Sequence, residues 1–289
     1  MLIAVLLTVL LQVVPVAAEE PSCSCADFAT DVADVERAFK ARNDRIALPL
    51  TVQHHAQFRA RVDQTYARAR CLADCASVPE KERNLARALL AVSAFKSQEI
   101  GHTAEEVRGR LTAAAETAER CLAVEPEHRG CMLWAAGARG LLVKGTWNPL
   151  QIRLPGELLE RFRAARAGLP PGADVYDGAA TRAEAALLMR APGIAGGDLG
   201  EARRLMERYT RSPRFPCRVA NRLLLAEARA RSGDTAGALA ALRAAEKLGL
   251  PGCGADRYEN ALSLEEIARC RARLEQDPTS DPGWDDACE

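Results

Sequence analysis

Residues 217–251 read CRVANRLLLAEARARSGDTAGALAALRAAEKLGLP and form the clearest copy of a repeated helical unit in the chain. Its apolar residues recur with helical periodicity, which predicts two amphipathic helices, over 217–232 and 235–248. Gly233-Asp234 separates the two helices and supplies a tight turn followed by a helix N-cap. The sequence therefore predicts a pair of antiparallel helices joined by a short connection.

An earlier copy of this unit begins 36 residues before, where Gly197-Asp198 opens a helix whose fifth residue is Ala202. Ala238 holds the same place after Gly233-Asp234. In the later copy, small residues fall where two helices must cross closely: Ala226, Ala238 and Ala245. Prolines follow each second helix: Pro126, Pro213 and Pro251. These features resemble tetratricopeptide repeats, although the spacing of 36 residues departs from the regular period of about 34.

The rest of the chain continues the pattern of paired helices. Helical periodicity predicts further helices at 26–44, 52–72, 82–98, 104–124, 130–145, 156–168, 176–190, 198–211 and 263–275. Aromatic residues make up only 4% of the chain, which suits closely packed helices better than strands. The predicted fold class is all-α, a disulfide-stapled, tetratricopeptide-like α-solenoid of stacked antiparallel helix pairs. A non-repeating helical bundle is the alternative.

The first eighteen residues, MLIAVLLTVLLQVVPVAA, carry no charge and end in small residues that suit a signal peptidase. We therefore expect a signal peptide over 1–18, cleavage near Ala18, a helical-repeat domain over 19–275 and an irregular tail over 276–289. Such a protein would be periplasmic or secreted. Association with a membrane is expected only if the N-terminal segment is retained. Glu20-Pro21-Ser22 before Cys23 does not form a lipidation signal.

Ten cysteines follow this segment, at positions 23, 25, 71, 75, 121, 131, 217, 253, 270 and 288. An even number of cysteines behind an export signal predicts disulfides, with buried free thiols as the alternative. Two pairs are favoured because each would staple one helix end to its neighbour: Cys121–Cys131 and Cys253–Cys270. Cys71 and Cys75 lie four residues apart on one predicted helix, so each is expected to pair elsewhere, with Cys23 or Cys25 as candidates.

The chain has 39 basic and 39 acidic residues, and this zero net charge provides no basic surface for a nucleic acid. Its four histidines form no metal or haem motif. We expect His54-His55 at a solvated helix end, with metal binding through one ring as the alternative, and His102 and His128 in ordinary exposed positions. The sequence contains neither a nucleophile elbow nor a phosphate-binding loop. We therefore predict no catalytic residue, no metal, no cofactor and no enzyme activity. The alternative is a hydrolase, which would need titratable groups converging on one pocket.

Exposed aromatic and amide side chains are good contact residues, and the loop around Trp147 and Asn148 contains both. Together with Tyr176, Asp177 and Arg182, these residues are expected to line one mouth of the solenoid and bind a partner. In the alternative interpretation, Trp147 fills a gap between helix pairs, Tyr176 closes a turn, and Arg182 pairs with Asp177.

Several segments also resemble the T-component proteins of bacterial TRAP transporters: LPGELL at 154–159, the Tyr176-Asp177-Gly178 turn followed by Arg182, and RAPGIAGGD at 190–198. The resemblance implies a helical periplasmic protein that assembles with itself and docks onto an extracytoplasmic ligand-binding protein. The missing lipidation signal and the many cysteines depart from that family. We thus expect a non-catalytic exported scaffold that binds a protein, peptide or small molecule. The alternative is an accessory component of TRAP-type solute uptake.

Overall fold

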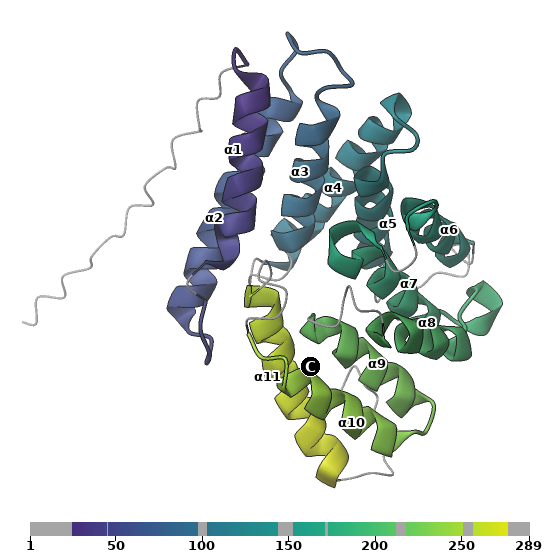
Figure 1. Ribbon diagram of the computed structural model, residues 1–289. Helices are drawn as coiled ribbons and strands as arrows, with labels where there is room; N and C mark the ends of the chain where they lie inside the picture. The colour runs from purple at the N-terminus through teal and green to yellow at the C-terminus, as the bar shows by residue number, and fades with distance from the viewer. Residues whose placement is uncertain are drawn as a thin grey trace, which may run out of the picture.

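The computed structural model describes residues 25–44, 46–97, 103–143, 153–170, 173–211, 218–250 and 257–276. Within these ranges the regular elements are all helices, so the predicted all-α class is confirmed (Figure 1). The α-helices are α1 (Phe28–Lys40), α2 (Val52–Ala73), α3 (Asn84–Lys96), α4 (Ala104–Val124), α5 (Arg129–Val143), α6 (Leu154–Arg166), α7 (Ala179–Arg190), α8 (Leu199–Arg211), α9 (Val219–Arg231), α10 (Thr235–Glu246) and α11 (Arg257–Gln276). Short 3-10 helices lie between them: η1 (Ala41–Asn43), η4 (Val175–Gly178) and η5 (Gly193–Ala195). No helix in the described ranges is both long and apolar enough to cross a membrane.

Several helices begin where a side chain caps the free backbone N–H groups of the first turn. Thr51 accepts a hydrogen bond from the N–H of His54, and His54 accepts one in return from the N–H of Thr51, which fixes the start of α2. Thr103 and Glu106 form the same reciprocal cap on α4. Asp234 caps α10 by accepting from the N–H of Gly237, as the Gly233-Asp234 turn predicts.

The helices pack in adjacent pairs along the chain, so that each contacts the next in sequence. The odd-numbered helices also contact one another in succession, from α1 to α3 and onward to α11. Alanines lie where α9 and α10 meet, and Ala226, Ala238 and Ala245 are all fully buried. Their size allows the two helices to approach closely, as the sequence predicts.

The last described helix returns to the first ones, because the first turn of α11 packs against α2 and the residues before it (Figure 1). Tyr258 is fully buried and stacks on Phe58 of α2, with ring centroids 3.8 Å apart. Its hydroxyl lies 2.6 Å from Nδ1 of His55, and its backbone N–H donates to Asn43 of η1. α11 therefore joins the last helical pair to the first.

A buried ion cluster completes this junction. Glu259 of α11 lies 2.8 Å from the guanidinium of Arg42 and 3.3 Å from the ammonium of Lys96, and all three side chains are at most 14% exposed. Burial by itself would raise the pKa of the Glu259 carboxyl, but the charges of Lys96 and Arg42 outweigh it and lower the pKa to about 2. The junction is thus held by a carboxylate that stays ionised.

The prediction for the last helix was wrong at its start, because α11 begins at Arg257 and not at residue 263. Glu259 and Asn260 are polar and hide the apolar periodicity of this turn, yet both are buried against other elements. The tail beyond Gln276 and the expected signal peptide over 1–18 lie outside the described residues.

Disulfides tie helix ends together. The favoured Cys121–Cys131 bond is present and joins the end of α4 to the start of α5. Cys75 pairs with Cys25, so Cys71 and Cys75 do not bond to each other, as predicted. Cys71 and Cys270 are also disulfide-bonded, each to a cysteine outside the described residues. Cys253 lies outside them too, so the Cys253–Cys270 pair stays a prediction. Every described cysteine is oxidised, which indicates a non-reducing compartment.

Replacing Gly197 with alanine is expected to lower the free energy of unfolding by about 1–3 kcal/mol. A Cβ atom at this position would lie 1.8 Å from the carbonyl oxygen of Ala191, and a backbone atom cannot rotate away as a side chain can. Gly193→Ala is the matched control in the same turn, because no atom lies within 4 Å of its added methyl group. Urea denaturation measures the unfolding free energy of both variants. Equal losses of stability would show that the backbone shifts and removes the clash at position 197.

Candidate binding site around Tyr176

The 3-10 helix η4 presents Tyr176 in an unusual backbone conformation. Tyr176 has φ of 47°, in the left-handed region that a bulky residue rarely adopts. Asp174 imposes this turn, since its carboxylate accepts from the N–H of Val175 at 2.6 Å and from the N–H of Thr181 at 3.0 Å. Gly178, with φ of 92°, completes the reversal into α7. The strained tyrosine is therefore fixed by its neighbours in the chain.

The ring of Tyr176 packs on α5 while part of it faces solvent. Its centroid lies 5.0 Å from that of Trp134, edge-on at 64°, and Trp134 in turn contacts Phe95 at 5.0 Å. The hydroxyl approaches Gly130 so closely that a Cβ atom there would lie 3.0 Å from it. Tyr176 nonetheless remains 42% exposed. We call Phe95, Gly130, Trp134 and Tyr176 the Tyr176 cluster.

The pKa of Tyr176 reflects the protein groups around its hydroxyl. Burial raises the pKa of Tyr176, the indole N–H of Trp134 opposes this, and the negative charge of Glu36 adds to it. Trp134 is only 4% exposed, and its indole nitrogen faces the tyrosine without making a hydrogen bond of normal geometry. The cluster thus combines a partly exposed tyrosine, whose hydroxyl end is surrounded by protein, with a buried N–H donor.

The first helix packs beside this cluster. Phe39 of α1 belongs to the same buried core as Trp134, with Val175 packed against it. Residues from three distant parts of the chain, α1, α5 and η4, therefore share one core at this place.

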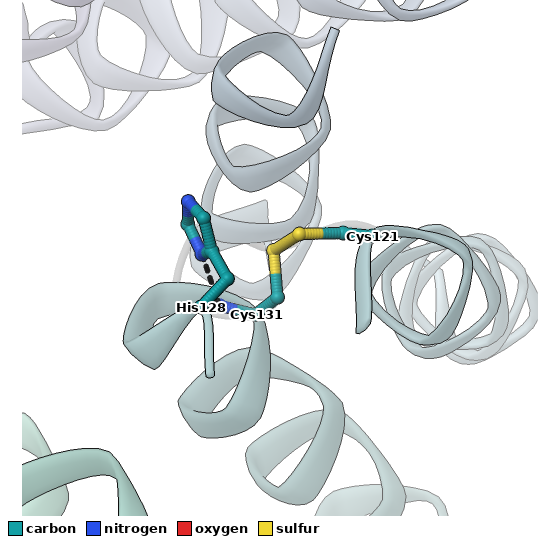
Figure 2. A group of neighbouring side chains, drawn as sticks. All are labelled: Cys121, His128 and Cys131. Carbon is teal, nitrogen blue, oxygen red and sulfur yellow. Dashed lines mark hydrogen bonds between the residues drawn. A yellow bond between two sulfur atoms is a disulfide. The ribbon is translucent and has the colours of Figure 1, made fainter. Parts of the chain in front are cut away.

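The N-terminus of α5, beneath Tyr176, is fixed by a disulfide and a histidine (Figure 2). Nδ1 of His128 accepts from the backbone N–H of Cys131 at 3.2 Å and so caps the helix. His128 Cε1 and the Tyr176 hydroxyl lie 3.3 and 3.0 Å from the Cβ position of Gly130. The prediction of an ordinary exposed histidine was wrong here, because His128 is half-buried by these contacts.

The ligand atoms of Cys121, His128 and Cys131 lie within 4.8 Å of one another, a grouping that could hold a metal ion. In Figure 2 the two sulfur atoms are bonded to each other, so in this form they offer no thiolate to a metal. The arrangement instead holds the end of α4 on the start of α5.

The predicted contact residues have different surroundings. Tyr176 lies in the cluster described above, whereas Arg182 of α7 donates to Asn221 of α9 at 3.1 Å. Asp177 falls within η4, but its side chain is outside what the structure describes. Trp147 and Asn148 also lie outside the described residues, so their place at the solenoid mouth stays a prediction.

Buried carboxylates in the described ranges are each bound by two cations: Glu184, Glu227 and Glu259. Glu184 pairs with Arg163 and Arg166 of α6. Glu227 pairs with Arg190 of α7 and with Arg231 on its own helix. These bonds link neighbouring elements, so the geometry explains the buried acids as packing contacts.

A hollow of about 700 Å³ lies between α4 and α5, lined in part by Glu119, Arg139 and Leu142. Glu119 lies 3.0 Å from Arg139 and 2.5 Å from Arg161 of α6, so the charges at this wall already form a network. The Tyr176 cluster, with an exposed aromatic ring held in a strained conformation, is the stronger candidate site.

Sequence reasoning missed His128 and Trp134 as neighbours of Tyr176. Trp134 sits in the apolar run CMLWAAGA, which has the pattern of a core helix. The spacing of Cys121, His128 and Cys131 was the one available sign that the histidine lies near the disulfide. The sequence matches no protein-family model and no curated protein.

Proposed function

We propose that this chain is an exported, non-catalytic helical-repeat scaffold of the α-solenoid type that binds a protein, peptide or small-molecule partner. Tyr176 carries this proposal, because it combines a left-handed backbone, 42% exposure and firm packing on α5. Strained residues persist only where the surrounding structure imposes them, and they cluster at binding sites. A rigid, exposed tyrosine loses little conformational entropy when it contacts a partner.

The packing supports the scaffold part of the proposal. Stacked antiparallel pairs give contacts both within a pair and between successive inner helices, and the odd-numbered helices make such contacts. Oxidised cysteines support export, since disulfides persist in non-reducing compartments. In the part of the chain that the structure describes, each buried acid is paired with cations, which supports a structural role for these acids over catalysis.

Tyr176→Ala is expected to weaken partner binding about tenfold or more, as is typical of an aromatic hot spot. A photo-crosslinking residue placed at position 176 identifies the partner in extracts of the native cells. Affinity for that partner is then measured by calorimetry with the wild type, Tyr176→Ala and Val52→Ala. Val52 is 86% exposed on α2 and serves as the control. Unchanged affinity in Tyr176→Ala would refute this site.

The accessory role in TRAP-type solute uptake is a second proposal, supported by the resemblance over 154–198. It expects a closed homo-oligomer in native mass spectrometry and a periplasmic binding protein that copurifies with the chain. A monomeric chain that binds some other partner and no periplasmic binding protein would count against the transport role. The scaffold proposal would then still stand.

A further inference from the structure

Cys121, His128 and Cys131 bring two sulfur atoms and an imidazole together at the junction of α4 and α5 (Figure 2). Their ligand atoms lie within 4.8 Å of one another, whereas the ligand atoms of a tetrahedral zinc ion lie about 3.5–3.8 Å apart. A movement of about 1 Å therefore brings the three groups to the spacing of a zinc site. His128 lies in the short connection between the two helices, so its ring can make this movement while both helices stay in place.

The imidazole of His128 is in the protonation state that a metal requires. Its Nδ1 accepts a hydrogen bond from the backbone N–H of Cys131 at 3.2 Å, so this nitrogen carries a lone pair and no proton. Metal ions bind the neutral form of histidine through such a lone pair. A metal ion at Nδ1 would take the place of the backbone N–H.

The two sulfur atoms become ligands only after their bond is reduced, because thiolates bind metal ions and the sulfurs of a disulfide do not. A dithiol reductant supplies two electrons and two protons, leaves both cysteines as thiols and itself becomes a disulfide. Cys131 is the third residue of α5, where the free N–H groups of the first turn stabilise a thiolate.

Burial selects the charge of the ion. Cys121 and Cys131 are both fully buried, and two uncompensated thiolates in such a place would be costly. Two thiolates, one neutral imidazole and one divalent cation together carry no net charge. Sulfur and imidazole ligands favour zinc, whereas magnesium prefers oxygen ligands.

We propose that, once a dithiol has reduced the Cys121–Cys131 bond, the two thiolates and His128 bind one Zn²⁺ ion. Binding releases the two thiol protons to solvent and leaves the fourth position of the ion to a water molecule. The ion then replaces the disulfide in holding the end of α4 on the start of α5. This inference is independent of the proposed function. It departs from the sequence-based prediction of no metal, which relied on the absence of zinc-finger spacing.

Protection from alkylation tests this site in the full chain. The protein is reduced with a phosphine, freed of the reductant under anaerobic conditions and treated with N-ethylmaleimide, with and without equimolar Zn²⁺. Peptide mass mapping over time is expected to show that zinc slows the alkylation of Cys121 and Cys131 about tenfold or more. Cys25 and Cys75 form the other disulfide within the described residues, and their alkylation should not change. Mg²⁺ should protect none of these cysteines.

Coordination by the histidine is tested separately. His128→Ala should lose most of the protection, because it removes one of three protein ligands. Co²⁺ serves as a spectroscopic probe, since a tetrahedral site with thiolates gives intense visible and sulfur-to-metal bands. The reduced double variant Cys25→Ser, Cys75→Ser should keep these bands, and the matched variant Cys121→Ser, Cys131→Ser should lose most of their intensity. Circular dichroism verifies that each reduced variant remains helical.

Equal protection of all cysteines by zinc would overturn the proposal, because it would indicate binding by an unfolded chain. An absence of protection at Cys121 and Cys131, or full protection in His128→Ala, would overturn it as well. Calorimetry of the unreduced chain tests the redox control. Zinc binding of equal affinity before and after reduction would show that the disulfide does not control the site.

Discussion

Replacing Glu259 with alanine is expected to lower the free energy of unfolding by about 3–5 kcal/mol, a large part of the stability of a typical domain. The substitution leaves the charges of Arg42 and Lys96 in a buried position without this carboxylate. Uncompensated charges in a low-dielectric interior are costly, so the first turn of α11 should separate from η1 and α3. Urea denaturation measures the loss, and faster hydrogen exchange in α11 would locate it.

Glu275→Ala is the matched control, on the same helix and also beside two cations. Glu275 lies 3.3 Å from Arg243 and 3.4 Å from Arg271, but its side chain is 39% exposed. Solvent screens this network, so the expected loss is below about 1 kcal/mol. Similar losses of unfolding free energy in the two variants would show that burial of the Glu259 ion cluster does not increase its contribution to stability.

The same carboxylate predicts a pH dependence. Its pKa is about 2 in the folded chain, below the ordinary value of 4.5, so its contribution to stability is complete above about pH 4.5. The contribution declines as the pH falls from about 4.5 to 2, because the unfolded chain then binds the proton more readily. The difference in unfolding free energy between the wild type and Glu259→Gln should therefore shrink over this interval. A constant difference would mean that Glu259 is not ionised.

Local patterns predicted most of the fold because helices form from neighbouring residues. The ranges around 104–124 and 235–248 follow from apolar periodicity, and the second range also from Asp234 as a cap. The junction between α11 and the first helices could not be predicted. Tyr258 and Glu259 are recognised only by residues about two hundred positions away, and a polar turn without that context reads as a loop.

The site was predicted less completely than the fold. The sequence singled out Tyr176 as a candidate contact residue because a tyrosine next to Asp177-Gly178 indicates a turn at the surface. Its strained φ and its position over Gly130 depend on how η4 docks on α5, which no spacing in the sequence records. Trp134 has the pattern of a core residue, and it is one, yet it also supports the exposed ring.

Replacing Trp134 with alanine is expected to lower the free energy of unfolding by about 3–5 kcal/mol, the range for deleting a large buried aromatic side chain. Trp134 is 4% exposed and contacts Phe95 on one side and Tyr176 on the other. Its loss leaves a cavity under the Tyr176 ring, so that ring should also become mobile. Urea denaturation and the tyrosine ring resonances in NMR measure the two effects.

Trp134→Phe separates packing from hydrogen bonding and is expected to cost less than about 1.5 kcal/mol. Phenylalanine keeps most of the aromatic contact and removes an indole N–H that is buried without a hydrogen-bond partner. Deleting an unsatisfied donor is favourable, which offsets part of the lost volume. A loss in Trp134→Phe as large as in Trp134→Ala would show that the indole N–H bonds to the Tyr176 hydroxyl. In that case Tyr176→Phe should cause a comparable loss, since it would remove the acceptor of the same bond.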